Sequence, residues 1–574
     1  MQQTLLLART FFRRFFESEL MPPGLPQVQL TISALTLLAA PGLLLPVRFA
    51  ANYIQLERYP PALAHALLAH RLLFVTFTMI GLGLVALVIW EGVFPDRRDA
   101  RILGALPVRG STLIAARLGA LGALAALFVV GMNAIPTILY GPVLAEYGAA
   151  ATPVHGALAH FVATSCAGAF VFFGLIALQG LLLNLAGRRL AERLSVALQL
   201  VFVVGLLQMI FFFPRLGQLF GTELGDLTTH PAIRLLPSVW FLALYDFVGG
   251  RPSPDAHALA AVALLATATV TLAAIGLLVA THGRLAKLAL ESRHSVGGRG
   301  RVLASLSRYV NATIVRNSTE RAALQFTLKT MIRSRTHRML IALYLGVALA
   351  LVVSAFLPLL VRLGFAGLTV FSIPLLSAPL VVMFLGLAGM RAVFAIPVEP
   401  KAHWVIRLLE PPRRMAAING VWDAMMLALV IPVCSVVLLT TAILLGVWPA
   451  IVHTTVCLLL GWILAELLVI TLSKLPFTCT YYPGLSRMRT MWPAYLIAFM
   501  NYCYSTPSLE YAIVGHPPSL AVFVAVCATV ILAIRIARAR RLAALPGFKF
   551  EEEDPEAMFR GFNLSEGLAA APKQ

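Results

Sequence analysis

The pattern of apolar and polar residues divides the chain into two similar sets of long apolar stretches. A stretch of about 20 apolar residues can cross the roughly 30 Å hydrocarbon core of a membrane. Six such stretches precede a basic segment, and six follow it. We predict membrane spans near residues 28–50, 72–91, 113–139, 157–184, 195–213, 257–281, 339–361, 367–390, 418–445, 449–472, 491–513 and 518–534.

A short amphipathic segment precedes each set of six spans. In residues 5–20, Phe11 lies on the apolar side of a helix and Arg13 on the opposite side. Residues 320–338 repeat this pattern, with Leu324 on the apolar stripe. Such helices lie in the membrane surface, with their apolar side in the acyl boundary. Each would either hold the first span of its set in place or transmit force from a cytosolic partner.

The sequence therefore predicts an all-α polytopic membrane protein with about twelve transmembrane helices in two parallel six-helix repeats. Because each repeat has an even number of spans, both have the same orientation, and their interface is the natural pathway for a substrate. The predicted parts are an N-terminal cytoplasmic interfacial helix (1–26), a first six-span half (27–282), a cytoplasmic linker with the second interfacial helix (283–338), a second six-span half (339–534) and a cytoplasmic tail (535–574).

Composition and charge agree with a membrane protein. Hydrophobic residues make up 59% of the chain and charged residues 12%, against about 25% charged residues in soluble proteins. The net charge of +20 could indicate nucleic-acid binding. Most Lys and Arg, however, fall on the side of the termini, which marks the cytoplasmic side. We therefore expect cytoplasmic termini, contacts with membrane lipids and no nucleic acid. The excess of Arg over Lys suggests a bacterial source, and hence the bacterial inner membrane.

Two loops at equivalent places in the halves are candidates for coupling to a partner. Loop 94–112 follows the second span of the first half, and loop 394–416 follows the second span of the second half. Each begins with Phe, contains a short helix-forming segment and ends at Pro followed by Arg. Proline ends such a helix and restricts the chain that follows. A short helix fixed at both ends can pass movement from a cytosolic subunit into two spans; the alternative is an ordinary basic hairpin. A third cytoplasmic loop, 474–484, is rich in aromatic residues.

The motifs in these loops resemble those of a known transporter family. The Asp-x-x-x-Leu-x-x-Leu-Pro-Val run at 99–108 is similar to the first intracellular loop of type-2 ABC exporter permeases. The Phe-x-x-Pro-x-Glu-x-x-x-x-Trp-x-x-Arg run at 394–407 resembles the corresponding loop of fused, full-length permeases. The resemblance implies a membrane subunit that docks on separate ATP-binding subunits, two of them in this form. Matched by position, the docking residues are Asp96, Arg97, Asp99, Leu106, Pro107, Glu399, Trp404, Arg407 and Glu410.

The chemistry of ATP hydrolysis is expected on that partner. The chain contains no Gly-Lys pair and so no Walker-type phosphate loop; ATP and Mg²⁺ would bind the partner. HExxH, GxSxG and SxxK motifs are absent too. We expect this chain to have no catalytic residue, no metal site, no cofactor and no enzyme activity of its own. The resemblance implies an exporter, and because the interior is mostly apolar, we expect a lipophilic or amphipathic substrate.

Two acidic residues lie inside predicted spans. Asp423 and Glu466 are at similar depth in neighbouring spans, near the cytoplasmic side. If their side chains face each other, one should bind a proton; alternatively, each reaches the headgroups or bonds a neighbouring helix. No belt of acidic residues or histidines crosses the middle of the membrane, which argues against a proton relay.

Two other classes of protein remain as alternatives. A major facilitator-type transporter also has twelve spans. Four residues fit the spacing of its loop between spans two and three: Gly92, Asp96, Arg97 and Arg101. Asp99 and Ile102 depart from that pattern, however, and the loop is longer than in that family. The second alternative is a polytopic membrane enzyme or an assembly scaffold.

Overall fold

The chain folds as an all-α polytopic membrane protein, as predicted. The computed structural model describes residues 2–16, 27–90, 92–95, 102–103, 107–220, 231–251, 254–291, 317–364, 372–397, 414–472, 475–478, 488–544 and 548. In this part of the chain, nine helices are long and apolar enough to cross a membrane. The other three predicted spans, at 28–50, 195–213 and 491–513, also fold as helices.

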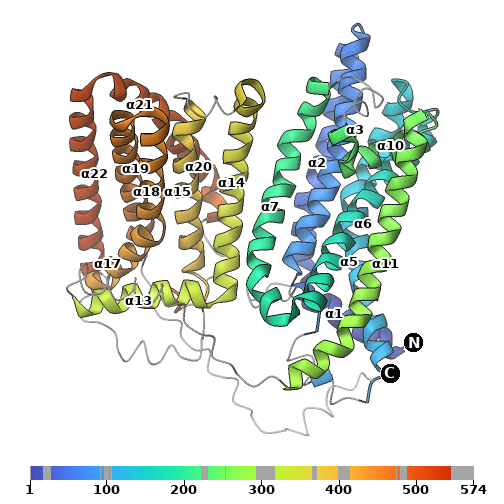
Figure 1. Cartoon of the computed structure of the whole chain (residues 1–574), viewed down its shortest axis with the longest axis horizontal. Coiled ribbons are helices and arrows are strands. Elements are labelled where there is room, and N and C mark those ends of the chain that lie inside the picture. Colours follow the sequence, from blue (N-terminus) through green and yellow to red (C-terminus); the bar gives the residue numbers. More distant parts are fainter. Residues whose placement is uncertain are drawn as a thin grey trace, which may run out of the picture.

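The helices form two bundles side by side (Figure 1). The first bundle contains α2 (Gln27–Leu56), α3 (Pro60–Val88), α5 (Gly110–Glu146), α6 (Pro153–Leu185), α7 (Gly187–Phe220), the short α9 (Pro231–Arg234) and α10 (Pro237–Val248), and α11 (Pro254–Glu291). The second contains α14 (Arg335–Leu363), α15 (Ile373–Val393), α17 (Arg414–Met425), α18 (Ile431–Leu445), α19 (Val447–Ile470), α20 (Met488–Met500), α21 (Thr506–Gly515) and α22 (Pro517–Ala543).

Two helices lie outside the row of spans. The amphipathic α1 (Gln2–Phe16) lies at one end of the first bundle, and α13 (Ser318–Arg333) lies across the same end of the second bundle. We call this end the inner face and the opposite end the outer face. The short helices α10 and α21 lie toward the outer face, each directly before the last helix of its bundle (Figure 1).

Serine produces the corner between α13 and α14. Ser334 ends α13, and its backbone N–H donates to the carbonyl of Thr330 at 3.0 Å. The same residue begins α14, since its side-chain oxygen accepts a hydrogen bond from the backbone N–H of His337. Serine is well suited to begin a helix because its hydroxyl satisfies one of the free N–H groups there. One residue therefore turns the chain from the surface helix into the first span of the second bundle.

The two bundles meet along α7 and α14 (Figure 1). Gly346 of α14 allows this approach, because a Cβ atom there would lie 3.0 Å from Cδ1 of Leu200 and 3.2 Å from Cγ1 of Val203. Gln208 of α7 donates a side-chain hydrogen bond to the carbonyl of Ala350. A glycine contact and one polar bond thus join the fifth helix of the first repeat to the first helix of the second.

Two short π-helical turns interrupt spans of the second bundle. The first is η3 (Met426–Val430), between α17 and α18, and the second is η5 (Asn501–Ser505), between α20 and α21. Each ends two residues before a proline, Pro432 or Pro507. Proline has no N–H to continue the regular ladder, and π-turns of this kind are frequent at functional sites.

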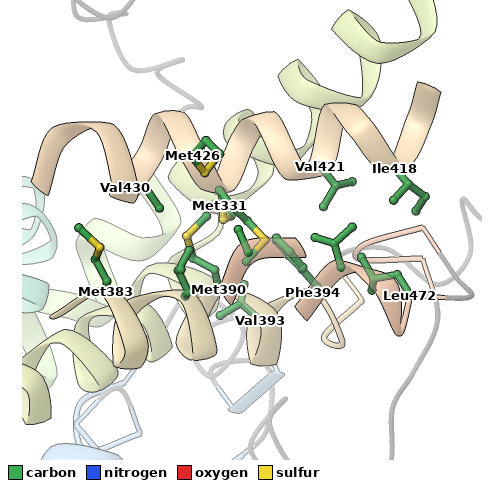
Figure 2. Close-up of a cluster of buried hydrophobic side chains, with 14 of the residues drawn as sticks. Met331, Met383, Met390, Val393, Phe394, Ile418, Val421, Met426, Val430 and Leu472 are labelled. Atoms are coloured by element: carbon green, nitrogen blue, oxygen red, sulfur yellow. The ribbon is translucent and has the colours of Figure 1, made fainter. Parts of the chain in front are cut away.

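Methionine is prominent in the core of the second bundle. Figure 2 shows the side chains of α17 and η3 facing those of α15, with Met331 from α13 among them. Met383 and Met390 of α15 and Met426 of η3 belong to this core. Methionine adapts its shape to irregular gaps. The surface helix α13 is thus part of the hydrophobic core and not only a flank of the first span.

Candidate functional site at the inner face

Three segments of the second bundle converge at the inner face. The backbone N–H of Phe477, which follows α19, donates to the carbonyl of Phe394, which follows α15, at 2.9 Å. The rings of these two phenylalanines are 5.7 Å apart, edge to face. Phe326 of α13 lies 5.9 Å from the Phe477 ring. We call Phe326, His337, Phe394, Ile396 and Phe477 the inner junction.

His337 fixes the α13–α14 corner to this junction. Its Nε2 lies 3.0 Å from the carbonyl oxygen of Ile396. Because a carbonyl only accepts hydrogen bonds, Nε2 carries the hydrogen, and in the neutral ring Nδ1 accepts one from the hydroxyl of Ser334. The imidazole also packs edge to face on Phe477, with ring centroids 5.0 Å apart. The first residues of loop 394–416 are therefore attached to the corner where the surface helix becomes a span.

Phe477 has an unusual backbone conformation. Its φ is +66°, in the left-handed region that residues with a side chain rarely adopt. This conformation costs roughly 1–2 kcal/mol for an L-residue. The buried ring and the bond to Phe394 hold it in place. Strained backbone that the surroundings maintain is found preferentially at functional sites.

The first bundle has an equivalent anchor. Phe94, after α3, is buried, and a Cβ atom at Gly180 of α6 would lie 3.1 Å from its Cζ. Gln179 of α6 donates to the carbonyl of Trp90 at 2.6 Å. Phe15 of α1 is the nearest side chain to the Cβ position of Gly92. In both bundles, the phenylalanine that begins the candidate loop packs against the inner end of the fourth span.

Each surface helix also packs on the third span of its bundle. At Gly420 of α17, a Cβ atom would overlap the carbonyl oxygen of Glu320 and would lie 2.9 Å from the backbone nitrogen of Leu324, so the α13 backbone crosses directly over this glycine. In the first bundle, the guanidinium of Arg117 on α5 lies 4.7 Å from the ring centroid of Phe11 on α1. The third span is the helix that each candidate loop enters, so the surface helix and the loop act on the same span.

The predicted docking residues lie mostly outside the described residues. Pro107 is described, and it is exposed three residues before α5 begins at Gly110. The others fall outside the described ranges: Asp96, Arg97, Asp99, Leu106, Glu399, Trp404, Arg407 and Glu410. Their docking role therefore stays a prediction. Phe477 and His337 were not predicted; the aromatic character of loop 474–484 was the signal for the first, and His337 has no comparable signal in the sequence.

Glu466 and Asp423 have separate partners. Glu466 is fully buried, and its carboxylate lies 2.8 Å from Nε of Arg535 and 2.9 Å from Nη1 of Arg538, both on α22. Arg538 also donates to the side-chain oxygen of Asn419 on α17 at 2.7 Å. Asp423 is close enough to Glu320 of α13 for the two carboxyl groups to interact. These contacts join the third, fourth and sixth spans and the surface helix at the inner end.

A second group of polar side chains is buried toward the outer face of the first bundle. The hydroxyl of Tyr53 lies 2.8 Å from Nδ1 of His70 and 2.8 Å from the hydroxyl of Tyr140. Arg71 of α3 forms an ion pair with Asp246 of α10. These contacts connect four helices and hold the short helix α10 against the spans. In the described part of the chain, no group of three His, Cys, Asp or Glu side chains is placed to bind a metal ion.

Comparisons with known proteins give no further assignment. No family model, no curated protein and no solved structure matches this chain.

Proposed function

We propose that this chain is the membrane permease of an ATP-driven ABC exporter, with its ATP-binding sites on two separate cytosolic subunits. The observation that carries the proposal is the inner junction, where the start of loop 394–416, the end of the fourth span and the corner of the surface helix are bonded together. A similar anchor at Phe94 and Gly180 supports a second docking position on the first bundle.

In the proposed mechanism, the ATP-binding subunits dock on loops 94–112 and 394–416. A push on the second loop would reach the fourth span through Phe394 and Phe477, which share a backbone hydrogen bond. It would reach the third span directly, because that span begins where the loop ends, and α13 would move with it through Gly420. ATP binding and hydrolysis on the partner would thus tilt two or more spans together. This arrangement requires the inner face to be cytoplasmic, in the inner membrane of a bacterium.

The surface of the fifth span of the second bundle, which is partly polar and partly apolar, is consistent with an amphipathic substrate. In η5, Asn501, Tyr504 and Ser505 are exposed, while Cys503 is buried. The side chains of Asn501 and Ser505 are 3.3 Å apart and hydrogen-bonded. The neighbouring α20 exposes apolar residues such as Ile497. We propose that this mixed surface contacts the substrate, with the polar patch binding its head and α20 its apolar part.

The test is purification of the tagged protein from its native membrane in mild detergent, followed by an ATPase assay. We expect a stoichiometric ATP-binding subunit whose retention is lost in the double charge reversal Asp96→Arg with Glu399→Arg. The matched control is Glu57→Arg, a charge reversal at an exposed residue of the outer face, which should leave the complex intact. A lone chain without ATPase activity would reject the proposal and favour a facilitator-type transporter, if transport follows an ion gradient, or an enzyme or scaffold, if it does not.

A further inference from the structure

Arg535 lies beside two tryptophan rings that pack on each other near the inner end of α22. Its guanidinium carbon is 5.1 Å from the ring centroid of Trp422 on α17 and 5.4 Å from that of Trp462 on α19. The two indole rings are 5.1 Å from each other. Cation–π contacts of this kind orient a guanidinium and hold it in one position. We call Arg535, Trp422 and Trp462 the arginine cage.

Among the described residues, only one edge of this guanidinium is bonded. Nε of Arg535 donates to Glu466 at 2.8 Å. Within the described part of the chain, its two terminal amino groups have no hydrogen-bond partner, and 41% of the side chain is exposed. The indole N–H groups of Trp422 and Trp462 are buried and also lack partners there. Buried donors in folded proteins nearly always bond to something, so these two indole N–H groups are expected to have a partner that the described residues do not supply.

The exposed charge at this site is positive. Glu466 is fully buried and is shared by two arginines; only 1% of the Arg538 side chain is exposed, against 41% of the Arg535 side chain. Asp423 also attracts both arginines and interacts with Glu320 of α13. The group that this site presents at its surface is therefore the Arg535 guanidinium.

The surroundings of the cage point to a lipid. Val526, Val530, Leu532 and Ile536 of α22 are exposed apolar residues, so this helix presents its side chains to the hydrocarbon of a membrane. Arg540 and Arg541 mark its inner end. Tryptophan and arginine are typical of the level of the headgroups, and the planar guanidinium can give two parallel hydrogen bonds to a phosphate. Inorganic phosphate has no apolar part that could contact the apolar surface beside the cage, whereas the acyl chains of a phospholipid could.

We propose that the arginine cage binds the phosphate group of an anionic phospholipid from the leaflet at the inner face. The acyl chains would lie along the exposed apolar side of α22. Because the cage draws its residues from α17, α19 and α22, a bound lipid would hold the last span to the third and fourth spans. This inference depends on the membrane location of the chain and not on the proposed transport function.

Native mass spectrometry of the purified full-length protein can test the site. The protein is titrated with phosphatidylglycerol or with phosphatidylcholine of the same acyl chains. We expect the first phosphatidylglycerol to be retained about tenfold more strongly than phosphatidylcholine. Both lipids carry the phosphate, but the trimethylammonium group of phosphatidylcholine would place another positive charge close to Arg535. Arg535→Gln should remove this preference. Arg541→Gln is the matched control, because it removes the same charge from an exposed position on the same helix, and it should retain the preference.

Arg535→Gln also breaks the contact with Glu466 and could therefore disturb folding. A second variant tests the site without breaking that contact. The double change Trp422→Phe with Trp462→Phe keeps both aromatic rings and the ion pair but removes the two indole donors, and it should weaken phosphatidylglycerol retention several-fold. Millimolar inorganic phosphate should not displace the lipid. Equal losses in Arg535→Gln and Arg541→Gln, no preference in the unchanged protein, or binding of inorganic phosphate in place of the lipid would each overturn the proposal.

Discussion

His453 of α19 and Glu510 of α21 form a buried pair, with Nδ1 2.8 Å from Oε1. The first bundle has the same arrangement, since Nδ1 of His160 on α6 lies 2.9 Å from the hydroxyl of Tyr245 on α10. In each case, a histidine near the outer end of the fourth span is tied to the short helix before the sixth span. The repeat therefore extends to the outer face, although the partner is a carboxylate in one bundle and a phenol in the other.

The carboxylate pair should contribute more stability than the phenol pair. Removing a partner so that a buried polar group is left unsatisfied costs about 1–3 kcal/mol, and more where a charged group is involved, while loss of a typical neutral hydrogen bond costs about 1 kcal/mol. We expect Glu510→Ala to lower the melting temperature clearly more than Tyr245→Phe does. Thermal unfolding in detergent, followed by intrinsic fluorescence, measures the difference. Equal effects of the two variants would contradict this view of the outer pairs.

The contact of α13 with α17 at Gly420 should not tolerate a side chain. A Cβ atom there would overlap the α13 backbone, and overpacking costs about 1–3 kcal/mol. We expect Gly420→Ala to lower the melting temperature and, if the proposed function holds, to reduce the ATPase activity of the complex. Gly122→Ala in α5 is the control, because a Cβ atom at Gly122 meets nothing within 4 Å. An unchanged melting temperature in Gly420→Ala would show that α13 does not pack closely on the third span.

The sequence predicts the helices well but not which of them are neighbours. The spans follow from apolar length alone, and loops 94–112 and 394–416 could be identified from Phe94 and Phe394. Several spans, however, are apolar on every side, with little helical periodicity to indicate the buried face. The pairing of His453 with Glu510 depends on that missing information.

The partners of the two acidic residues in the spans of the second bundle were likewise not predicted from the sequence. Asp423 and Glu466 lie in the inner parts of the third and fourth spans of the second bundle. Their partners were not predictable, because Arg535 and Arg538 were assigned to a cytoplasmic tail from residue 535. In the structure, α22 continues to Ala543, and Arg535 and Arg538 contact the buried Glu466 of the bundle. A buried carboxylate stabilises these charges inside the helix, which a count of apolar residues does not reveal.

Removal of the Glu466 charge should destabilise the second bundle. Glu466→Gln leaves the buried guanidinium of Arg538 without its carboxylate, at a cost of about 3–5 kcal/mol. The double variant Glu466→Gln with Arg538→Gln removes both charges and should recover part of the loss. Melting temperatures of the two single variants and the double variant give the coupling between the residues. Strictly additive effects would mean that the two side chains do not interact.

The backbone conformation of Phe477 predicts that a glycine variant is more stable than an alanine variant, the reverse of the usual order. Phe477→Ala and Phe477→Gly both delete the buried ring, at a cost of about 3–5 kcal/mol. Glycine adopts a φ of +66° without strain, whereas alanine retains a penalty of roughly 1–2 kcal/mol. The glycine variant should therefore have the higher melting temperature, although a glycine variant is normally less stable than the alanine variant at the same position. If the alanine variant is the more stable, the left-handed conformation is not held by the bond to Phe394 in the folded protein.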